Sequence, residues 1–273
     1  MDQADWAAVE LAAGELRLWL MEGGESVTAS CGDDPGQTLR ALLLPMLEGG
    51  QVMDVVACGW PGVEPVRVPC PPPPPAVPMD LDPRIRLHAL PGLVQDRPLD
   101  LLARAVPLIG GHLAVVPDFD GVLCLPGQPS AWVQISAGEI VSFRSFLTAE
   151  ILSALDAAPR AAFDKAAFTE GVAQAMSRPA SLAADLSSAR AGLALGRTDR
   201  AAAGSRMAGL MIGVELAAAR PWWLGQNVVI IGDCPLTELY VEALAAQGVI
   251  AAKADPEQTR LAGMRAARPR LSL

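Results

Sequence analysis

The feature that most constrains this sequence is a run of short strands followed by a helix, which occurs once in each half of the chain. In the first half, two short apolar stretches lie between Val9 and Leu20, and a third strand is expected at 26–30. In the second half, strands are expected at 122–125, 131–135 and 139–146. Turn residues separate the strands in both halves, as in an antiparallel meander. Two such units in tandem predict a duplicated α/β fold with a ligand cleft between two lobes.

The remaining segments add helices and buried strands to this plan. Thr38–Leu47 has helical spacing, and the continuous apolar run 52–57 has the length of a strand covered on both faces. A helix is also expected from Thr148, with this residue as its N-cap. Further helices are expected at 163–176, 182–195, 201–219, 236–247 and 256–268, with strands at 228–231 and 249–252. We therefore predict an N-terminal lobe at 1–118 and a C-terminal lobe at 119–273.

A proline-rich segment at 61–98 interrupts the first lobe. It contains the uninterrupted run Pro71–Pro75, and a stiff polyproline segment does not fit inside a sheet. We expect the whole segment to be an excursion on the surface of the lobe. A ligand for a proline-recognition domain is the alternative reading.

Charge and composition exclude several classes of function. The net charge is −9 and the pI about 4.8, so the surface repels nucleic acid. No apolar run is long enough to span a membrane, and the acidic amino end does not resemble a signal peptide, so a cytoplasmic location is expected. The cysteines are scattered singly and the histidines His88 and His112 lie far from any cysteine pair, which disfavours a zinc site. The oligomeric state stays open, a homo-oligomer included.

Motifs in the second half point to a family. Pro126–Val133 reads Pro-Gly-Gln-Pro-Ser-Ala-Trp-Val, and Phe143–Glu150 reads Phe-Arg-Ser-Phe-Leu-Thr-Ala-Glu. Ala208–Leu216 reads Ala-Gly-Leu-Met-Ile-Gly-Val-Glu-Leu, and Gly232, Leu236 and Tyr240 follow at regular spacing. In order and spacing this series resembles the motifs of the 2-dehydro-3-deoxygalactonokinases, bacterial sugar-acid kinases of the actin-like ATPase superfamily.

The first half is similar to the same family at its opening hairpin. The family has an Asp-Trp-Gly-Thr segment and then an Arg-x-Trp. Arg17-Leu18-Trp19 matches the second motif, which aligns Glu10 to Ala13 with the first. The alternative segment Asp5-Trp6-Ala7-Ala8 would leave Arg17 too far away.

The resemblance implies a fold, a reaction and a set of site residues. The fold is two actin-like ATPase lobes of ribonuclease H-like type. The reaction is ATP-dependent phosphorylation, with Mg²⁺, of the terminal hydroxyl of 2-dehydro-3-deoxy-D-galactonate or a similar sugar acid. No catalytic residue is assigned. The implied nucleotide contacts are Ala12, Ala13, Gly14, Gly127, Gly232 and Asp233, the implied substrate contacts are Arg17, Thr148 and Glu150, and the implied magnesium ligand is Glu10.

Both phosphate-binding hairpins depart from the family pattern. The first lacks hydroxyl side chains and carries Glu15, whose charge opposes a triphosphate. In the second, Gln128, Pro129 and Ala131 stand where the family has Thr, His and Lys, so a cation and a backbone donor are lost. Two hypotheses follow: a working kinase, or a catalytically degenerate relative that acts as a metabolite-binding or regulatory protein.

Several of the assigned residues also have purely structural readings. Arg17 fits a surface position, Thr148 and Glu150 fit an N-cap pair, and Gly232-Asp233 fits a plain tight turn. Glu215 lies in an apolar helix and is expected either buried and paired or at the cleft.

Overall fold

The computed structural model describes residues 6–21, 25–157 and 163–268. They form two compact units. The first comprises the described residues within 1–119, 138–140 and 257–273, and the second those within 120–137 and 141–256. The last helix was predicted in the C-terminal lobe, whereas the contacts of residues 257–267 group this helix with the first unit.

The main sheet of the first unit has the strand order β3-β2-β1-β4-β7-β6. The strands are β1 (Trp6–Ala12), β2 (Glu15–Met21), β3 (Glu25–Ser30), β4 (Met53–Cys58), β6 (Val77–Asp82) and β7 (Ile85–Ala89). β1, β2 and β3 pair antiparallel as the predicted meander, and β4 lies parallel to both β1 and β7. Every residue of β4 is buried, as its continuous apolar sequence predicts.

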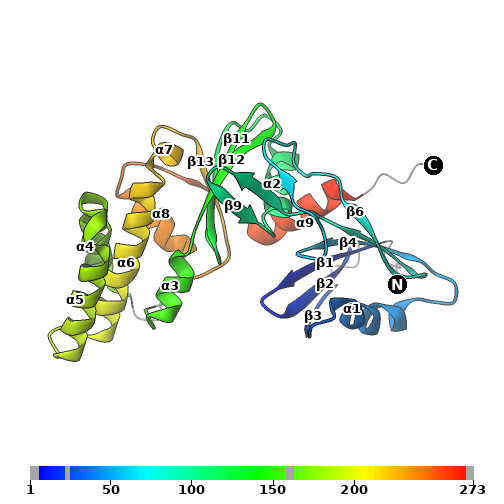
Figure 1. Ribbon diagram of the computed structural model, residues 1–273, viewed down its shortest axis with the longest axis horizontal. Helices are drawn as coiled ribbons and strands as arrows, with labels where there is room; N and C mark the ends of the chain where they lie inside the picture. The colour runs from blue at the N-terminus through cyan, green and yellow to red at the C-terminus, as the bar shows by residue number, and fades with distance from the viewer. Residues whose placement is uncertain (1–5, 22–24, 158–162, 269–273) are drawn as a thin grey trace. The chain divides into compact units, whose positions relative to one another are not determined.

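Helices cover the two faces of this sheet according to the alternation of residues along each strand. Val9 and Leu18 belong to the core that includes Leu39 and Leu43 of helix α1 (Pro35–Leu43), which ends in a short 3₁₀ turn, η1 (Leu44–Met46). Figure 1 shows α1 against the strands of this unit. The alternate residues of β1 and β2 face helix α9 (Pro256–Ala267), which contacts both strands through its side chains.

The segment before the second unit contradicts part of the proline-rich prediction. Residues 61–98 were expected to be a surface excursion, but β6 and β7 belong to the main sheet and β7 pairs directly with β4. The prolines that argued against a sheet are concentrated before these strands, and Ile85–Ala89 alternates buried residues with an exposed and a half-buried one, as a strand does. A small second sheet contains β5 (Val66–Arg67), β8 (Leu93–Asp96) and β9 (Leu99–Leu102), and helix α2 (Val106–Val115) follows it.

The sheet of the second unit has the strand order β12-β11-β10-β13-β14. Its strands are β10 (Gly121–Leu125), β11 (Ser130–Ser136), β12 (Glu139–Phe146), β13 (Val228–Ile231) and β14 (Ala252–Ala254). Both main sheets therefore join an antiparallel meander to parallel strands in the same order, which is the ribonuclease H-like arrangement of actin-like ATPase lobes. The predicted fold class, α/β with two such lobes, is confirmed; the cleft between them stays a prediction.

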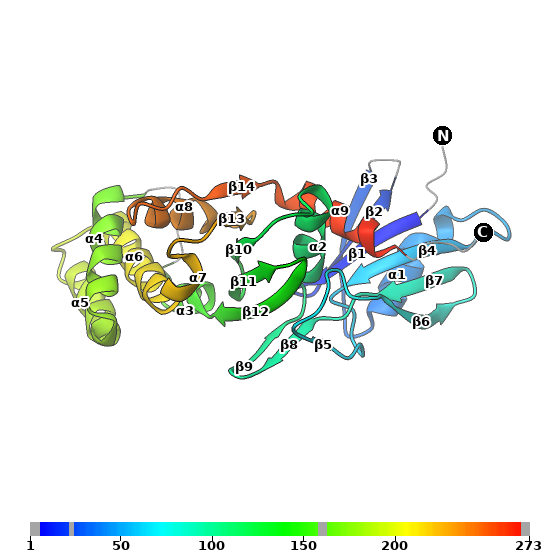
Figure 2. The same ribbon diagram turned by 90° about the horizontal axis from the view of Figure 1, so that it is seen from above.

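The second unit also carries most of the helices. They are α3 (Thr148–Ala154), α4 (Lys165–Ser177), η2 (Pro179–Ser181), α5 (Leu182–Ala194), α6 (Arg200–Ala218), α7 (Arg220–Trp223) and α8 (Thr237–Ala245). Figures 1 and 2 show α4, α5 and α6 side by side. Asp164 and Asp199 start α4 and α6 by accepting backbone N–H groups, as N-caps do. Among the described residues, no helix is both long enough and apolar enough to cross a lipid bilayer.

Glycines let α4 and α6 approach closely. A Cβ on Gly209 would lie 2.1 Å from the carbonyl oxygen of Phe168, and a Cβ on Gly171 would lie 2.5 Å from that of Arg206. On α6, the helix that contains Gly209, a Cβ on Gly204 would meet nothing within 4 Å. The helix contact therefore depends on hydrogen at some glycine positions and not at others.

Gly209→Ala is expected to destabilise the protein by about 2 kcal/mol or more, because the methyl group forces two backbones apart. Gly204→Ala is the matched control and is expected to stabilise by about 0.5–1 kcal/mol, the usual gain of alanine over glycine inside a helix. Urea denaturation of the two variants and the wild type measures both changes. Equal effects of the two substitutions would contradict this account of the helix contact.

Candidate functional site

The turn between β1 and β2 is built from two residues with left-handed backbone. Ala13 and Gly14 have φ values of 51° and 77°, and Ala12 pairs with Glu15 on either side of them. Two-residue turns with positive φ at both positions are of type I′, which matches the twist of a hairpin. The N–H groups of these two residues lie outside the strand ladder, while the carbonyl of Gly14 accepts the N–H of Cys31 at 2.7 Å. The turn is thus fixed to β3 and presents exposed backbone donors.

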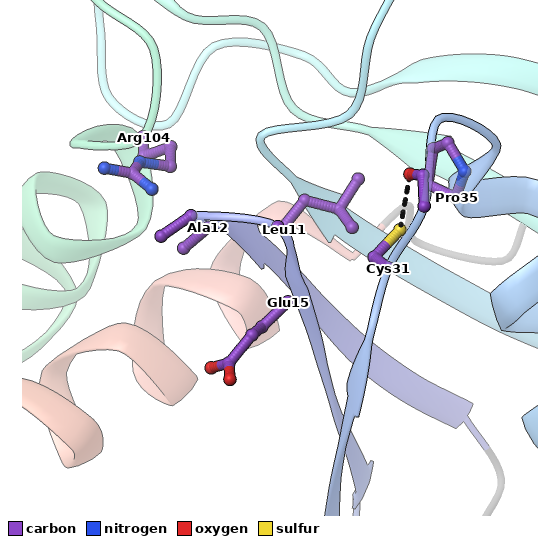
Figure 3. A pocket seen from close by; sticks show the side chains of 9 residues that line it. Leu11, Ala12, Glu15, Cys31, Pro35 and Arg104 are labelled. Atoms are coloured by element: carbon purple, nitrogen blue, oxygen red, sulfur yellow. Dashed lines mark hydrogen bonds between the residues drawn. The ribbon is translucent and has the colours of Figure 1, made fainter.

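A cavity of about 240 Å³ adjoins this turn. It is lined by Leu11, Ala12, Ala13, Gly14, Glu15, Cys31, Gly32, Pro35 and Arg104. In Figure 3 the guanidinium of Arg104 lies next to Ala12, and the carboxylate of Glu15 lies apart from it. A Cβ on Gly59 would lie 2.5 Å from the carbonyl oxygen of Leu11 and 3.4 Å from the Arg104 side chain, so a glycine there lets these chains meet. Backbone donors and one guanidinium make the cavity suitable for an anion.

Arg104 is the residue that the sequence analysis missed in this cavity. One signal could have drawn attention to it, because Arg104 is the only Lys or Arg between Arg97 and Arg144 and its neighbours are mostly apolar. A charged residue in an apolar stretch is rarely buried unless it has a partner, which singles out such a position.

Glu10, the implied magnesium ligand, has a protein partner in the structure. Its Oε1 lies 3.1 Å from Nε of Arg260 on α9, with exposed side-chain fractions of 16% and 11%. A divalent cation at this carboxylate would meet the guanidinium, and the described residues contain no group of three or more His, Cys, Asp or Glu placed to hold a metal. These residues do not fit direct binding of Mg²⁺ by the protein.

Cys58 lies at the end of β4 beside this ion pair. Burial and, to a smaller extent, the negative charge of Glu10 raise the pKa of its thiol to about 12, although Arg260 and Arg104 oppose the shift. The thiol therefore stays protonated at neutral pH and does not act as a nucleophile.

Arg17, the implied ligand of the substrate carboxylate, also pairs with α9. It donates to Glu257 Oε1 at 2.7 Å, and the indole N–H of Trp19 donates to the same oxygen at 3.1 Å. The guanidinium carbon lies 4.6 Å from the centre of the Trp19 ring. Arg17 is thus held in place by an internal carboxylate and an aromatic face. Its role toward a substrate stays a prediction.

In the second unit the implied nucleotide turns are brought together. β10 and β13 are parallel, with Cys124 opposite Ile230, so the turns that follow them lie at the same edge of the sheet. A Cβ on Gly232 would lie 2.7 Å from Oγ1 of Thr237 and 3.2 Å from Cδ of Pro126, next to Gly127. Asp233 is exposed beside this contact. Ligands of α/β folds bind at the carboxyl ends of parallel strands, which is where these residues lie.

Glu215 of α6 accepts hydrogen bonds from four side chains. Ser130 and Tyr240 donate to its Oε2 at 2.9 and 2.7 Å, Thr148 donates to the same oxygen, and the indole of Trp132 donates to Oε1 at 2.9 Å. The residue is 1% exposed. Burial raises the pKa of the Glu215 carboxyl, and the hydrogen bonds partly oppose the shift. Of the two predicted positions, buried and paired is confirmed.

The start of α3 differs from its prediction. Leu147 is the N-cap residue, and Thr148 is the first helical residue and makes no capping hydrogen bond. The expected N-cap role of Thr148 is therefore wrong, because its hydroxyl is directed into the core toward Glu215. Glu150 is half-buried, and its Oε2 has no hydrogen-bond partner among the described residues.

Comparisons with known proteins agree on one family. Residues 7–267 match the family described as 2-keto-3-deoxy-galactonokinase. A protein of Rhizobium meliloti (strain 1021) named as a probable 2-dehydro-3-deoxygalactonokinase is 31% identical over 201 residues, which are 69% of this chain and 65% of that protein. The 2-dehydro-3-deoxygalactonokinase of Escherichia coli (strain K12) is 30% identical over 149 residues, 52% of this chain and 50% of that one. The aligned stretches thus span less than two thirds of these relatives.

A solved structure is similar over nearly the full chain. It is a Sinorhizobium meliloti protein provisionally described as a 2-dehydro-3-deoxygalactonokinase, with a TM-score of 0.85 and 26% sequence identity. The similarity covers 98% of this chain and 100% of that one.

The raised pKa of Glu215 predicts a pH dependence of stability. Because the folded-state pKa lies above the ordinary value of 4.5, the folded protein binds this proton more tightly than the unfolded chain does. The resulting stability is fully present below the unfolded pKa and is lost as pH rises through the folded pKa. The unfolding free energy of the wild type relative to Glu215→Gln is therefore expected to fall as pH rises from about 4.5.

Urea denaturation of both proteins over a pH series measures this difference. Glu48→Gln, which changes an exposed carboxylate, is the matched control for general charge effects. A difference that is constant or grows with pH would contradict the assignment of a raised pKa to Glu215.

Proposed function

Because this chain belongs to the 2-keto-3-deoxy-galactonokinase family, we propose that it transfers the γ-phosphoryl group of ATP to 2-dehydro-3-deoxy-D-galactonate or a closely similar sugar acid. The transfer breaks the bond between the γ-phosphorus and its bridging oxygen and forms a bond to a hydroxyl oxygen of the sugar acid, which loses its proton. The observation that carries the proposal is the family match across residues 7–267, which includes both structural units.

The cavity beside the β1–β2 turn supports binding of phosphate oxygens. Phosphoryl transfer depends mainly on positioning and on neutralising charge. The backbone N–H groups of Ala13 and Gly14 are donors that need no side chain, with Ala12 forming the adjoining wall. Arg104 lines the same cavity and supplies a cation that neither hairpin provides. These groups would compensate for the hydroxyl donors that the first hairpin lacks and for the cation that the second hairpin lacks.

The strand-end turns of the second unit are the proposed contacts for the rest of the nucleotide. Gly127 and Gly232 offer backbone without a side chain, and the exposed Asp233 offers a carboxylate acceptor. An acceptor of this kind suits the hydroxyl groups of a ribose.

For the sugar acid we propose Glu150 as the leading contact. Its Oε2 is a buried acceptor without a partner among the described residues, and such an atom is costly unless a ligand completes it. Arg17 remains a proposed ligand of the substrate carboxylate, on condition that it exchanges Glu257 for the substrate. We do not propose Glu10 as a metal ligand, because Arg260 occupies its carboxylate.

In this proposal the sugar acid is the small-molecule partner and ATP is the phosphate donor. Because ATP is used as a substrate, the cytoplasm is the favoured location. A nucleic-acid partner is not proposed, since the net charge is −9. A protein that binds the sugar acid without phosphoryl transfer would instead fit the second hypothesis, a metabolite-binding or regulatory relative.

The purified chain is expected to consume ATP only when 2-dehydro-3-deoxy-D-galactonate or a similar acid is added, with one phosphorylated product formed for each ADP. A coupled assay for ADP, with the product identified by mass spectrometry, measures this. A panel of sugar acids serves as the substrate series, and the corresponding aldoses without a carboxylate serve as controls. Absence of product with every acid would refute the proposed function.

Arg104→Ala is expected to raise KM for ATP by about tenfold or more, because the cavity loses its charge-assisted hydrogen bonds to phosphate. KM for the sugar acid should change far less. Steady-state kinetics with each substrate varied in turn measures the two constants. Arg67→Ala is the matched control, since Arg67 is an exposed arginine of the same unit outside the cavity. An unchanged KM for ATP would remove Arg104 from the site.

A further inference from the structure

Glu215 connects two of the three segments of the second unit that carry proposed site residues; the third is the turn with Gly232 and Asp233. Ser130 directly follows the turn 126–129, which contains Gly127, and Trp132 lies on the same strand, β11. Thr148 begins α3 two residues before Glu150. Ser130, Trp132 and Thr148 donate to the carboxylate of Glu215. The fourth donor, Tyr240, comes from α8. One side chain on α6 thus holds the nucleotide turn and the start of α3 against a common acceptor.

We propose that Glu215 is a positioning residue of this kinase, which fixes the 126–129 turn through Ser130 and Trp132 and fixes the start of α3 through Thr148. The proposal rests on the function proposed above. Glu215 itself touches neither substrate nor nucleotide, since it is 1% exposed. Its effect on the reaction is transmitted through the segments that it anchors.

The donor set requires a carboxylate rather than any polar group. The indole N–H of Trp132 only donates, so Oε1 must accept. Oε2 accepts three hydroxyl groups, from Ser130, Thr148 and Tyr240. A carboxylate has about four acceptor sites, whereas an amide presents one oxygen and one donating nitrogen. Glutamine at this position keeps the volume but cannot accept from both sides at once.

A stabilising role alone does not explain the charge. Glu215 lies among the buried apolar residues that form the core of the second unit, including Trp132 and Met211. An ionised group there carries a large desolvation cost. Well-packed apolar residues often replace buried polar networks without loss of stability. What an apolar residue does not reproduce is fixed direction, because hydrogen bonds to a charged acceptor are short and oriented. Orientation of Ser130 and Thr148 is therefore the property that the carboxylate supplies.

The test compares Glu215→Gln with variants that each remove one donor. Glu215→Gln is expected to raise KM for ATP and for the sugar acid by about tenfold each, the change that loss of one oriented, charge-assisted hydrogen bond gives. Trp132→Phe should raise mainly KM for ATP, because it loosens β11 behind the turn. Thr148→Val should raise mainly KM for the sugar acid, because it loosens the start of α3.

One control separates positioning from simple stability. Ser205→Ala removes a buried hydroxyl of the same helix that accepts the N–H of Asp164 at 2.9 Å. It is expected to lower the melting temperature and to leave both KM values within about twofold of the wild type. If Glu215→Gln, Trp132→Phe and Thr148→Val behave like this control, the proposal is overturned.

Amide hydrogen exchange gives a readout that does not depend on turnover. In Glu215→Gln, peptides covering 126–134 and 147–152 are expected to exchange faster than in the wild type, while Ser205→Ala leaves them unchanged. Unchanged exchange in these peptides refutes the positioning role even if the kinase is active. Absence of turnover by the wild type refutes the proposed function and leaves the exchange result to decide the anchoring. If Glu215→Gln does not fold, the same comparison is made with Thr148→Val and Ser130→Ala.

Discussion

The parallel pairing of β1 with β4, and of β10 with β13, carries the ends of each strand pair to the same edge of its sheet. The other features of the site depend on this pairing. In the first unit it places Gly59, which follows β4, against Leu11 at the end of β1, and Arg104 packs into the same contact. In the second unit it places Gly232 against Pro126. A Cβ on Gly59 would lie 2.5 Å from the carbonyl oxygen of Leu11, and a Cβ on Gly232 would lie 3.2 Å from Cδ of Pro126 and 2.7 Å from Oγ1 of Thr237, so both positions favour glycine.

Helix α9 pairs with two charged residues of the β1–β2 hairpin. Its Glu257 and Arg260 pair with Arg17 and Glu10, the residues to which the family resemblance gave the substrate carboxylate and the metal. The pair with Arg260 is largely buried, so separating it would leave an uncompensated charge. The cation that faces the turn is instead Arg104, which reaches the cavity from the segment before α2. The charges around the candidate site therefore differ from those that the motifs alone indicate.

The second unit contains a carboxylate, that of Glu215, buried in an apolar core. Glu215 accepts hydrogen bonds from β11, α3 and α8, which satisfies its oxygens and links three elements that are distant in sequence. The same bonds take up the hydroxyl of Thr148, which therefore packs inward. Glu150, two residues later, keeps an acceptor without a partner among the described residues. Packing therefore directs Thr148 into the core and leaves Glu150 as a candidate contact for a ligand.

The sequence by itself determined the local elements and the family. Alternation and turn residues predicted both meanders, β4 was predicted from its apolar run, and a series of short motifs identified the kinase family, because these signals lie within a few residues of one another. Only the tertiary structure decided the partners of the charged residues. Arg17 and Glu257 are 240 positions apart, and nothing in the neighbourhood of either residue encodes the other. The same holds for Arg104 beside the Ala13-Gly14 turn, for β7 beside β4 despite the prolines before it, and for the inward direction of Thr148. Each depends on which surfaces the folded chain brings together, a property of long-range packing that no local pattern contains.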